Sequence, residues 1–442
     1  MKRSTDRILV THAGALPQPD DLREMVAARS KGELSDPDAL GRRLRSAVAE
    51  IVQKQIDCGI DIVNDGELAK TNFLIYTRER LAGFEQQPRK PEERPAMIYG
   101  RDLDDFPEYF EEGPQRGRHF QAVCNAPIKY IGHAAVRADI ENFKAGLQGD
   151  KAEEAFLPAI APGTIEHIIR NEYYPNDEAY LYAIADAMHE EYKAIADSGL
   201  ILQIDDPDLP DGWQIQSHMS VPEYRKFAAL RIDALNHALR DIPLERIRFH
   251  TCWGSYHGPH KYDIPLRDIV DLILKVRAQA YSIDSSNPRH EHEWRVWEDV
   301  KFPKGKIFIP GVVGHVSDII EHPELIAERL VRFARLVGRE NVIAGTDCGL
   351  GPRVGHPKIV WAKFEAMAEG ARLATKQLWG RKPRTKVSKS KKTSEKPTKK
   401  IAKKPTKKAT KKTIKKVTKK ATKKTSRKPG GKTTKRRKAR GR

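Results

Sequence analysis

The sequence predicts an α/β fold, a (β/α)8 TIM barrel with an insertion between its second and third strands and a disordered C-terminal tail. Three observations predict it: short apolar, β-branched runs recur eight times, segments of helical period separate most of them, and the chain ends in a lysine-rich repeat. Strands that alternate with helices pair in parallel through right-handed crossovers, and eight of them close a barrel. A doubly wound open sheet is the alternative.

The eight candidate strands each end in residues that interrupt a strand, such as Gly, Asp, Pro or His. In chain order they are RILVTHAG, GIDIVNDGE, AFLPAIAPG, LILQIDDP, RIRFHTC, AYSIDSSNP, KIFIPGVVG and NVIAGTDCG. A helical period marks the connecting segments 39–57, 178–198, 222–241, 266–278 and 323–338.

The connection between the second and third strands is far longer than the others. We expect residues from about 86 to 150 to form an insertion, a small hairpin with a helix, that caps one mouth of the barrel. Long insertions of this kind are commonly functional. The predicted domains are therefore a barrel over residues 1–380 and a tail over residues 381–442.

Charge is distributed very unevenly along the chain. Residues 381–442 hold 31 of the 80 Lys and Arg side chains and one of the 60 acidic ones, so this segment carries +30. The first 380 residues consequently carry −10, and the basic character of the whole chain belongs to the tail. The tail repeats a Lys-Lys pair every four residues and lacks the apolar side chains that would compensate the entropy of ordering, which predicts disorder.

Four widely spaced cysteines do not resemble the disulfide framework of a small secreted protein. The N-terminus has no apolar core long enough for a signal peptide, and no window approaches the length of a membrane span. We therefore expect a soluble protein of the cytoplasm with no membrane contact, while its oligomeric state stays open.

Metal-ligand residue types gather where the predicted strands end, which is where barrel enzymes build their sites. His250 and Cys252 are two residues apart on one strand and project from the same face. A lone pair of this kind is more often part of a core. Here a metal site is the better interpretation of the pair, because other predicted strands also end in residues that bind metals or substrates. These are Glu67, Asp205, Asp206, Asp284, Asp347 and Cys348.

His250, Cys252, Cys348 and one carboxylate would form a soft tetrahedral set that favours Zn²⁺ over Mg²⁺ or Ca²⁺. Two thiolates leave such a metal electron-rich. This suits it less to hydrolysis than to holding a substrate thiol as a thiolate nucleophile at neutral pH.

Six motifs carry a family resemblance: VTHAGALPQPDDL, DIVNDGE, LQIDDPDLP, FHTCWG, SIDSSNPRHEHEW and AGTDCGL, in this order. They resemble the catalytic barrel of cobalamin-independent methionine synthase and its short zinc-dependent alkyltransferase relatives, over roughly residues 5–355. The resemblance implies an S-methyltransferase or S-alkyltransferase that uses Zn²⁺, a small thiol and a methyl or alkyl donor, with a folate as one candidate donor.

By position, the resemblance implies that His250, Cys252, Cys348 and Asp284 bind zinc. It also implies that Glu67 and Asp205 act in catalysis by holding the amino group of a homocysteine-like substrate. Three departures from the family stand out. The fourth zinc ligand is usually Glu, so His290 or Glu291, within residues 290–293, competes with Asp284. The serine expected near the substrate carboxylate is Ala15, and the N-terminal half of the long methionine synthases is absent.

The tail supports a second hypothesis of a different class, a nucleic-acid-associated protein. A +30 segment is expected to condense on polyanions without sequence preference, and its composition resembles that of linker-histone tails. Association with the nucleoid would follow. The lysines expected to contact DNA or RNA include Lys399, Lys400, Lys403, Lys404, Lys407 and Lys408.

Two further alternatives concern the barrel. One is a coenzyme-M-type alkyl (epoxide) transferase, which would use the same zinc site. The other is a metal-free barrel of the uroporphyrinogen decarboxylase type, which would not need the set of His250, Cys252 and Cys348. Because none of these three residues is lost, we place the zinc enzyme first and treat nucleic-acid contact as an added property of the tail.

Overall fold

The computed structural model describes residues 1–72, 75–88, 100–112, 120–147, 149, 152–351 and 353–380. The predicted tail, which includes the six lysines named above, lies outside these residues. Parts of the predicted insertion also lie outside them, so its described elements are treated separately below.

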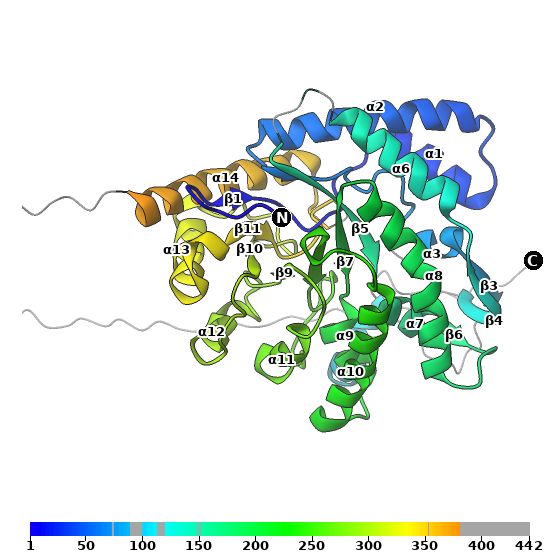
Figure 1. The fold of residues 1–442 in the computed structure, drawn as a ribbon. Coiled ribbons are helices and arrows are strands. Elements are labelled where there is room, and N and C mark those ends of the chain that lie inside the picture. Colours follow the sequence, from blue (N-terminus) through cyan, green and yellow to red (C-terminus); the bar gives the residue numbers. More distant parts are fainter. Residues whose placement is uncertain are drawn as a thin grey trace, which may run out of the picture. The chain divides into compact units, whose positions relative to one another are not determined.

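Eight parallel strands form the centre of the fold (Figure 1). Each of the eight runs predicted from the sequence contains one of them, and the strand order β1-β11-β10-β9-β8-β7-β5-β2 follows the chain around a nearly closed barrel. This confirms the predicted (β/α)8 class and excludes the open doubly wound sheet. The strands are β1 (Leu9–Val10), β2 (Ile62–Val63), β5 (Glu154–Ile160), β7 (Ile201–Asp205), β8 (Ile247–Thr251), β9 (Ala280–Ile283), β10 (Ile307–Val313) and β11 (Ile343–Thr346).

The barrel closes between its two shortest strands, β1 and β2, largely through Asp61. The backbone N–H of Asp61 donates to the carbonyl of Val10 at 2.9 Å, and its carboxylate accepts from the N–H of Val10 at 2.8 Å. The hydroxyl of Thr11 donates to the carbonyl of Ile62 at 3.0 Å. Side chains thus supply hydrogen bonds that two-residue strands cannot make by backbone pairing alone.

The inside of the barrel is filled, as expected for eight strands. One apolar cluster takes side chains from seven of the strands: Leu9, Ile62, Phe156, Ile201, Ala280, Ile307, Ile309 and Ile343. Beyond it, buried Arg248 donates to the hydroxyl of Thr11 and to the carbonyl of His12, at 3.0 and 2.9 Å. The interior is therefore a packed core and not a channel.

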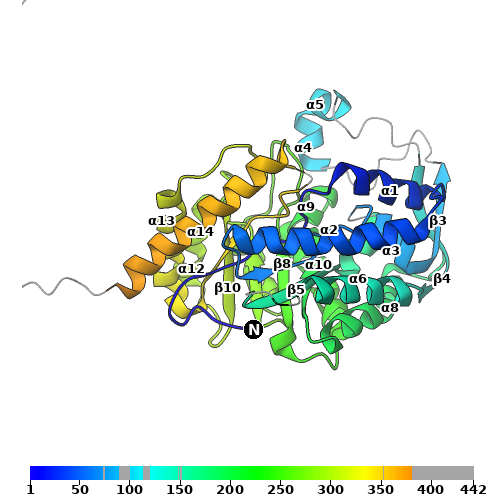
Figure 2. The same ribbon diagram turned by 90° about the horizontal axis from the view of Figure 1, so that it is seen from above.

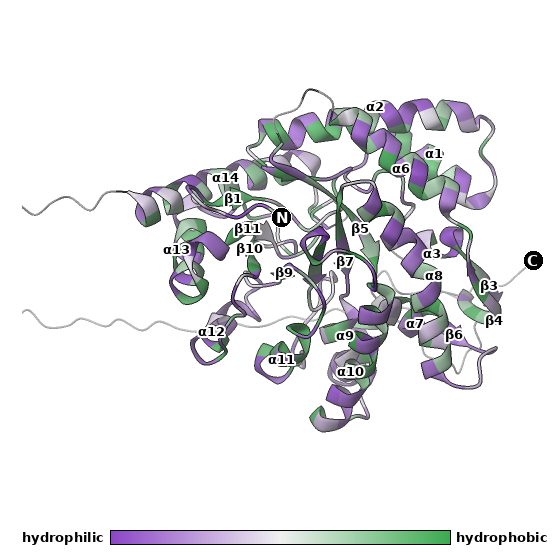
Figure 3. Ribbon diagram, in the orientation of Figure 1, coloured by the Kyte–Doolittle hydropathy of each residue, from purple (hydrophilic) through white to green (hydrophobic). Residues whose placement is uncertain are grey.

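Helices surround the strands (Figure 1), and the view from above shows α2 and α14 lying across them (Figure 2). Their buried faces and the strands form one large apolar core, and Figure 3 shows the strands as mainly hydrophobic ribbons. The helices are α1 (Asp20–Lys31), α2 (Pro37–Asp57), α3 (Ile75–Arg80), α7 (Pro162–Ile168), α8 (Asp177–Asp197), α9 (Asp208–Ile215), α10 (Val221–Ala238), α11 (Val270–Ile273), α12 (Val296–Asp299), α13 (Pro323–Val337) and α14 (Pro357–Trp379), besides those of the insertion.

Helix starts follow local capping chemistry. The side chain of Asp36 accepts from the N–H of Ala39 at the start of α2, and Asn176 caps α8 in the same way. Four of the five predicted helical segments correspond to single helices. The segment 266–278 was expected to be one helix but contains a short 3-10 turn and then only α11, and the hydroxyl of Tyr281 binds the carbonyl of Val276 at 2.8 Å.

The insertion contains an antiparallel pair, β3 (Leu81–Pro88) and β4 (Phe120–Tyr130), with β6 (Arg170–Asn171) beside β4. Its helices are α4 (Gly100–Asp105), α5 (Pro107–Glu112) and α6 (His133–Gly146). An antiparallel strand pair and helices thus lie in this part of the chain, but β3 already begins at Leu81, and α4 and α5 lie between the two strands in the sequence. Helix α4 contacts segments that follow β7 and β8: Arg101 donates to the carbonyl of Trp213, and Asp102 accepts from the N–H of Tyr262.

No helix in the described part of the chain combines the length and the apolar character needed to span a membrane.

Candidate metal and substrate site

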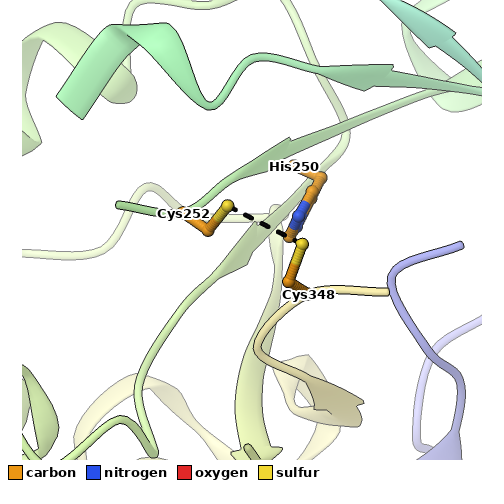
Figure 4. Close-up of side chains that lie close together, drawn as sticks. All are labelled: His250, Cys252 and Cys348. Atoms are coloured by element: carbon orange, nitrogen blue, oxygen red, sulfur yellow. Dashed lines mark hydrogen bonds between the residues drawn. The ribbon is translucent and has the colours of Figure 1, made fainter. Parts of the chain in front are cut away.

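The ends of β8 and β11 bring one imidazole and two thiols together (Figure 4). His250 lies in β8, Cys252 follows that strand, and Cys348 follows β11. One ligand atom from each lies within 4.8 Å of the others, and the two sulfur atoms are 3.9 Å apart. His250 and Cys252 are 3% and 2% exposed. The convergence of these three residues, expected from the sequence, is present, and the cluster can hold a metal ion.

The two thiols differ in proton affinity. The hydrogen bond from the Cys252 thiol, followed by that from His250, holds the pKa of Cys348 well below its usual range. The same contact with Cys348, together with burial, raises the pKa of Cys252 well above it. Of the two thiols, Cys348 therefore loses its proton more readily. A soft cation bound to both sulfur atoms would favour the thiolate form of both cysteines.

Asp284, directly after β9, is 2% exposed, and neither of its carboxylate oxygens has a hydrogen-bond partner. Burial, followed by the charge of Asp347, raises its pKa well above the usual range. Its oxygens do not belong to the close group formed by His250, Cys252 and Cys348. A buried carboxyl without partners is costly unless a cation or proton joins it. Asp284 is thus a candidate ligand at a longer reach.

The competing residues 290–293 are engaged elsewhere. Both ring nitrogens of His290 have carboxylate partners at 2.9 Å, Asp263 and Glu293. Glu291 pairs with Arg329, and His292 is exposed. Their contacts connect the segment after β9 to Asp263, in the segment after β8, and to Arg329 in α13, which leaves Asp284 as the stronger candidate.

Glu67 and Asp205 stand on the neighbouring side of the barrel. Asp205 ends β7 and lies beside His250 in the sheet register. Burial, with the charge of Glu67 as a further contribution, raises the pKa of Asp205 to about 7, against the opposing effect of His250. Gln203 donates to Asp205 at 2.7 Å. The two acids therefore share one electrostatic environment with the cluster of His250, Cys252 and Cys348.

Glu67 has a backbone φ of 57°, in the left-handed region that residues other than glycine rarely adopt. A Cβ at Gly14 would lie 2.5 Å from its Oε1 atom, so the carboxylate packs against the loop after β1. Ala15, the next residue, contacts Gly349 beside Cys348, since a Cβ at Gly349 would lie 2.9 Å from that of Ala15. Local strain at a carboxylate in a site is typical of functional residues.

His315 was not singled out from the sequence. It follows β10, is fully buried, and neither ring nitrogen has a hydrogen-bond partner. Burial lowers its pKa, while the charges of Cys348 and Asp347 oppose that effect. The available signal was its position in GVVGH, at the end of the seventh predicted strand. A single buried histidine is usually satisfied by a partner, so this one is unusual.

Comparison with known proteins assigns the family. The sequence matches the family described as "Cobalamin-independent synthase, Catalytic domain" over residues 8–91 and 162–372, and the gap covers most of the insertion together with β5. It is 23% identical over 371 residues to a methionine synthase of Saccharolobus islandicus strain L.S.2.15, covering 83% of this chain and 95% of that one. A methionine synthase of Sulfurisphaera tokodaii is 24% identical over 370 residues, covering 83% and 93%.

A solved structure agrees on the fold. The B12-independent methionine synthase of Shewanella sp. W3-18-1, in complex with selenomethionine, aligns with a TM-score of 0.63 and 20% identity, over 84% of this chain and 99% of that one. The family match confirms both the resemblance inferred from the six motifs and the predicted enzyme class, an S-methyltransferase. This chain belongs to the cobalamin-independent synthase catalytic-domain family.

Proposed function

We propose that this enzyme transfers a methyl group to the thiol of homocysteine, with Zn²⁺ bound by His250, Cys252, Cys348 and Asp284. The single observation that carries the proposal is the buried group of one imidazole and two thiols at the ends of β8 and β11. The match to methionine synthases along most of the chain supports the reaction type.

The residues fit zinc by their donor chemistry. Two sulfur ligands and one imidazole select a soft or borderline cation over Mg²⁺ or Ca²⁺. Asp284 offers a buried carboxyl as the fourth ligand, and a bound cation would favour its charged form, which burial and Asp347 otherwise disfavour. When bound there, zinc would lower the pKa of a substrate thiol so that it reacts as a thiolate at neutral pH.

The chain's own residues then orient the substrate. Glu67 and Asp205 supply carboxylates for the ammonium group of homocysteine, because Asp205 lies beside His250 in the sheet and the charge of Glu67 acts on Asp205. Holding the amine fixes the thiol relative to Cys252 and Cys348, and this restriction of motion accelerates a bimolecular transfer. Ala15 lacks the hydroxyl that could bind the carboxylate, so recognition in this site depends more heavily on the amine.

His315 is suited to move the proton. Its nitrogens have no hydrogen-bond partner, so the neutral ring is available to accept the proton released by the substrate thiol, and the charges of Cys348 and Asp347 support the protonated form against burial. Methyl transfer then forms the S–C bond and breaks the bond between the methyl carbon and the donor atom. With a methylated folate as donor, His315 returns the proton to the nitrogen that leaves, so charge and protons balance.

The family match favours this reaction over the two other predicted activities. A coenzyme-M-type alkyl transfer would use the same metal ligands but has no need of two acids for a substrate amine. A protein that acts only through its tail has no need of a buried His-Cys-Cys group.

The test is a thiol screen on the zinc-loaded enzyme with methyl-tetrahydrofolates of different glutamate number. We expect about one zinc per chain and methionine as the product. Full activity after complete removal of the metal would contradict the role of zinc, and alkylation of 2-mercaptoethanesulfonate but not homocysteine would favour the coenzyme-M alternative.

A further inference from the structure

Lys70 lies in direct contact with one of the two proposed substrate-binding acids. Its ammonium nitrogen is 3.1 Å from Oε2 of Glu67, and the two side chains are only 10% and 12% exposed. The same nitrogen donates to the carbonyl of Pro158 in β5 at 2.7 Å and lies 4.6 Å from the centre of the Tyr76 ring. A lysine placed this deeply requires compensation for its lost hydration.

Carboxylates provide that compensation. Burial alone would lower the pKa of Lys70, but the charges of Glu67, Asp65, Asp205 and Glu191 outweigh it and raise the pKa above its ordinary value. The lysine therefore stays protonated. A positive charge therefore lies beside Glu67 at neutral pH.

Lys70 also restrains the backbone of Glu67. Its own N–H donates to the carbonyl of Glu67 at 3.0 Å, while the N–H of Glu67 donates to the Asp65 side chain at 3.0 Å. These bonds close the turn in which Glu67 has its left-handed φ. Main chain and side chain of Lys70 thus both contact the same residue.

The two oxygens of Glu67 have different surroundings. Lys70 occupies Oε2, whereas Oε1 packs against the loop after β1, at Gly14, and accepts no hydrogen bond within the described residues. A substrate ammonium that binds Oε1 would give each oxygen of Glu67 a cationic partner. Without Lys70, Oε2 would lose the cation that holds it.

We propose that Lys70 is a positioning residue that fixes Glu67 by its Oε2 atom, so that Oε1 recognises the ammonium group of an α-amino thiol. This inference rests on the proposed function and specifies its substrate class. Lys70 itself contacts neither the metal ligands nor the reacting sulfur.

The test compares homocysteine with 4-mercaptobutyrate, the same thiol acid without the amine. Dissociation constants are measured by calorimetry on the zinc-loaded full-length chain for wild type, Lys70→Met, Lys70→Arg and the control Lys193→Met, which removes an exposed lysine paired with Asp197. We expect Lys70→Met to weaken homocysteine binding by about tenfold or more, the scale of one charge-assisted contact. Binding of 4-mercaptobutyrate should change by less than about twofold.

Further readouts separate positioning from general damage. Lys70→Arg should recover most of the homocysteine affinity, zinc content should stay unchanged, and KM should rise more than kcat falls. Three results for Lys70→Met would overturn the role of Lys70 and leave the proposed function intact. They are an equal loss of affinity for both thiols, no loss of affinity, and tighter binding of homocysteine. A wild-type enzyme that bound neither thiol would overturn the proposed function, and this inference with it.

Discussion

The sulfur atoms of Cys252 and Cys348 lie 3.9 Å apart although 96 residues separate them in the chain. Parallel strands explain the contact, because β8 and β11 end at the same mouth of the barrel, and Cys252 and Cys348 lie one and two residues after their strands. Two thiols in van der Waals contact beside an imidazole form a ready set of ligands for a soft metal ion, and most predictions about this enzyme depend on that group.

Replacing either cysteine should remove the metal. Cys252→Ala or Cys348→Ala leaves one thiol and one imidazole, too few soft ligands to hold zinc against a chelator. We expect zinc content, measured by mass spectrometry of the purified protein, to fall from about one per chain to less than about a tenth of that. Cys58→Ala is the control, because Cys58 packs in the core beyond α2. Full zinc in both site variants would contradict the assignment.

The length of the acidic side chain at position 284 should determine how slowly the metal is released. Asp284→Ala should speed the release of zinc to a chelator by about tenfold to a hundredfold, the effect typical of losing a group that supports a metal. Asp284→Glu should retain the metal at least as well as wild type, because the longer side chain reaches further toward the sulfur atoms. Glu291→Ala should behave as wild type, since Glu291 pairs with Arg329. A release rate more sensitive to Glu291 than to Asp284 would reverse the choice of fourth ligand.

The acids Glu67 and Asp205 should bind substrate and not metal. Glu67→Gln and Asp205→Asn each replace a charge by a neutral amide of the same shape, which costs about 1.5–3 kcal/mol for a hydrogen bond to a charged group. KM for homocysteine should therefore rise by about tenfold to a hundredfold. Zinc content should stay at the wild-type value, and its loss in either variant would show that the acid belongs to the metal site.

Stability should depend on pH through the buried contact of His290 with Asp263. Burial opposes protonation of His290, but its bonds to Asp263 and Glu293 raise its pKa, and the pKa of Asp263 is lowered against burial by its bonds to His260 and His290. A histidine with a raised folded pKa stabilises the protein below its unfolded pKa of about 6.5 and loses that contribution as the pH rises through the folded value. An aspartate with a lowered folded pKa stabilises the protein at pH values above its unfolded pKa of about 3.8.

The ionic contact between Asp263 and His290 therefore stabilises the protein most between about pH 3.8 and about pH 6.5. His290→Gln should lower Tm more at pH 6 than at pH 9, measured by calorimetry on the metal-loaded protein. His292→Gln, at an exposed position in the same segment, should change Tm little at either pH. An equal loss at both pH values for His290→Gln would mean that packing on Trp253, 3.9 Å away between ring centroids, matters more than the charge.

The repeating pattern of the sequence was enough to predict the eight strands and the group of His250, Cys252 and Cys348, because period and strand ends are local properties. Contacts between distant loops were not predictable in this way. His315 is a single histidine whose lack of partners appears only in three dimensions. Residues 290–293 were predicted as possible ligands, yet His290 is bound to Asp263, in the segment after β8, and Glu291 to Arg329 in α13. The side-chain contact of Lys70 with Glu67 likewise had no sequence signal, since an acid and a lysine three residues apart usually form a solvated pair.

The tail remains the part of the chain for which only the sequence supplies an argument. Residues 381–442 carry +30 with Glu395 as their one acid, so they should bind DNA strongly at low salt, lose affinity steeply as salt rises, and show little sequence preference. The first 380 residues, at −10, should not take part.

A chain that ends at Gly380 should therefore keep zinc and transferase activity but lose DNA binding in a salt titration followed by fluorescence anisotropy. Replacing Lys399, Lys400, Lys403, Lys404, Lys407 and Lys408 by Gln in the full chain should reduce the salt slope without touching activity. Equal DNA affinity with and without the tail would assign it a role as a spacer.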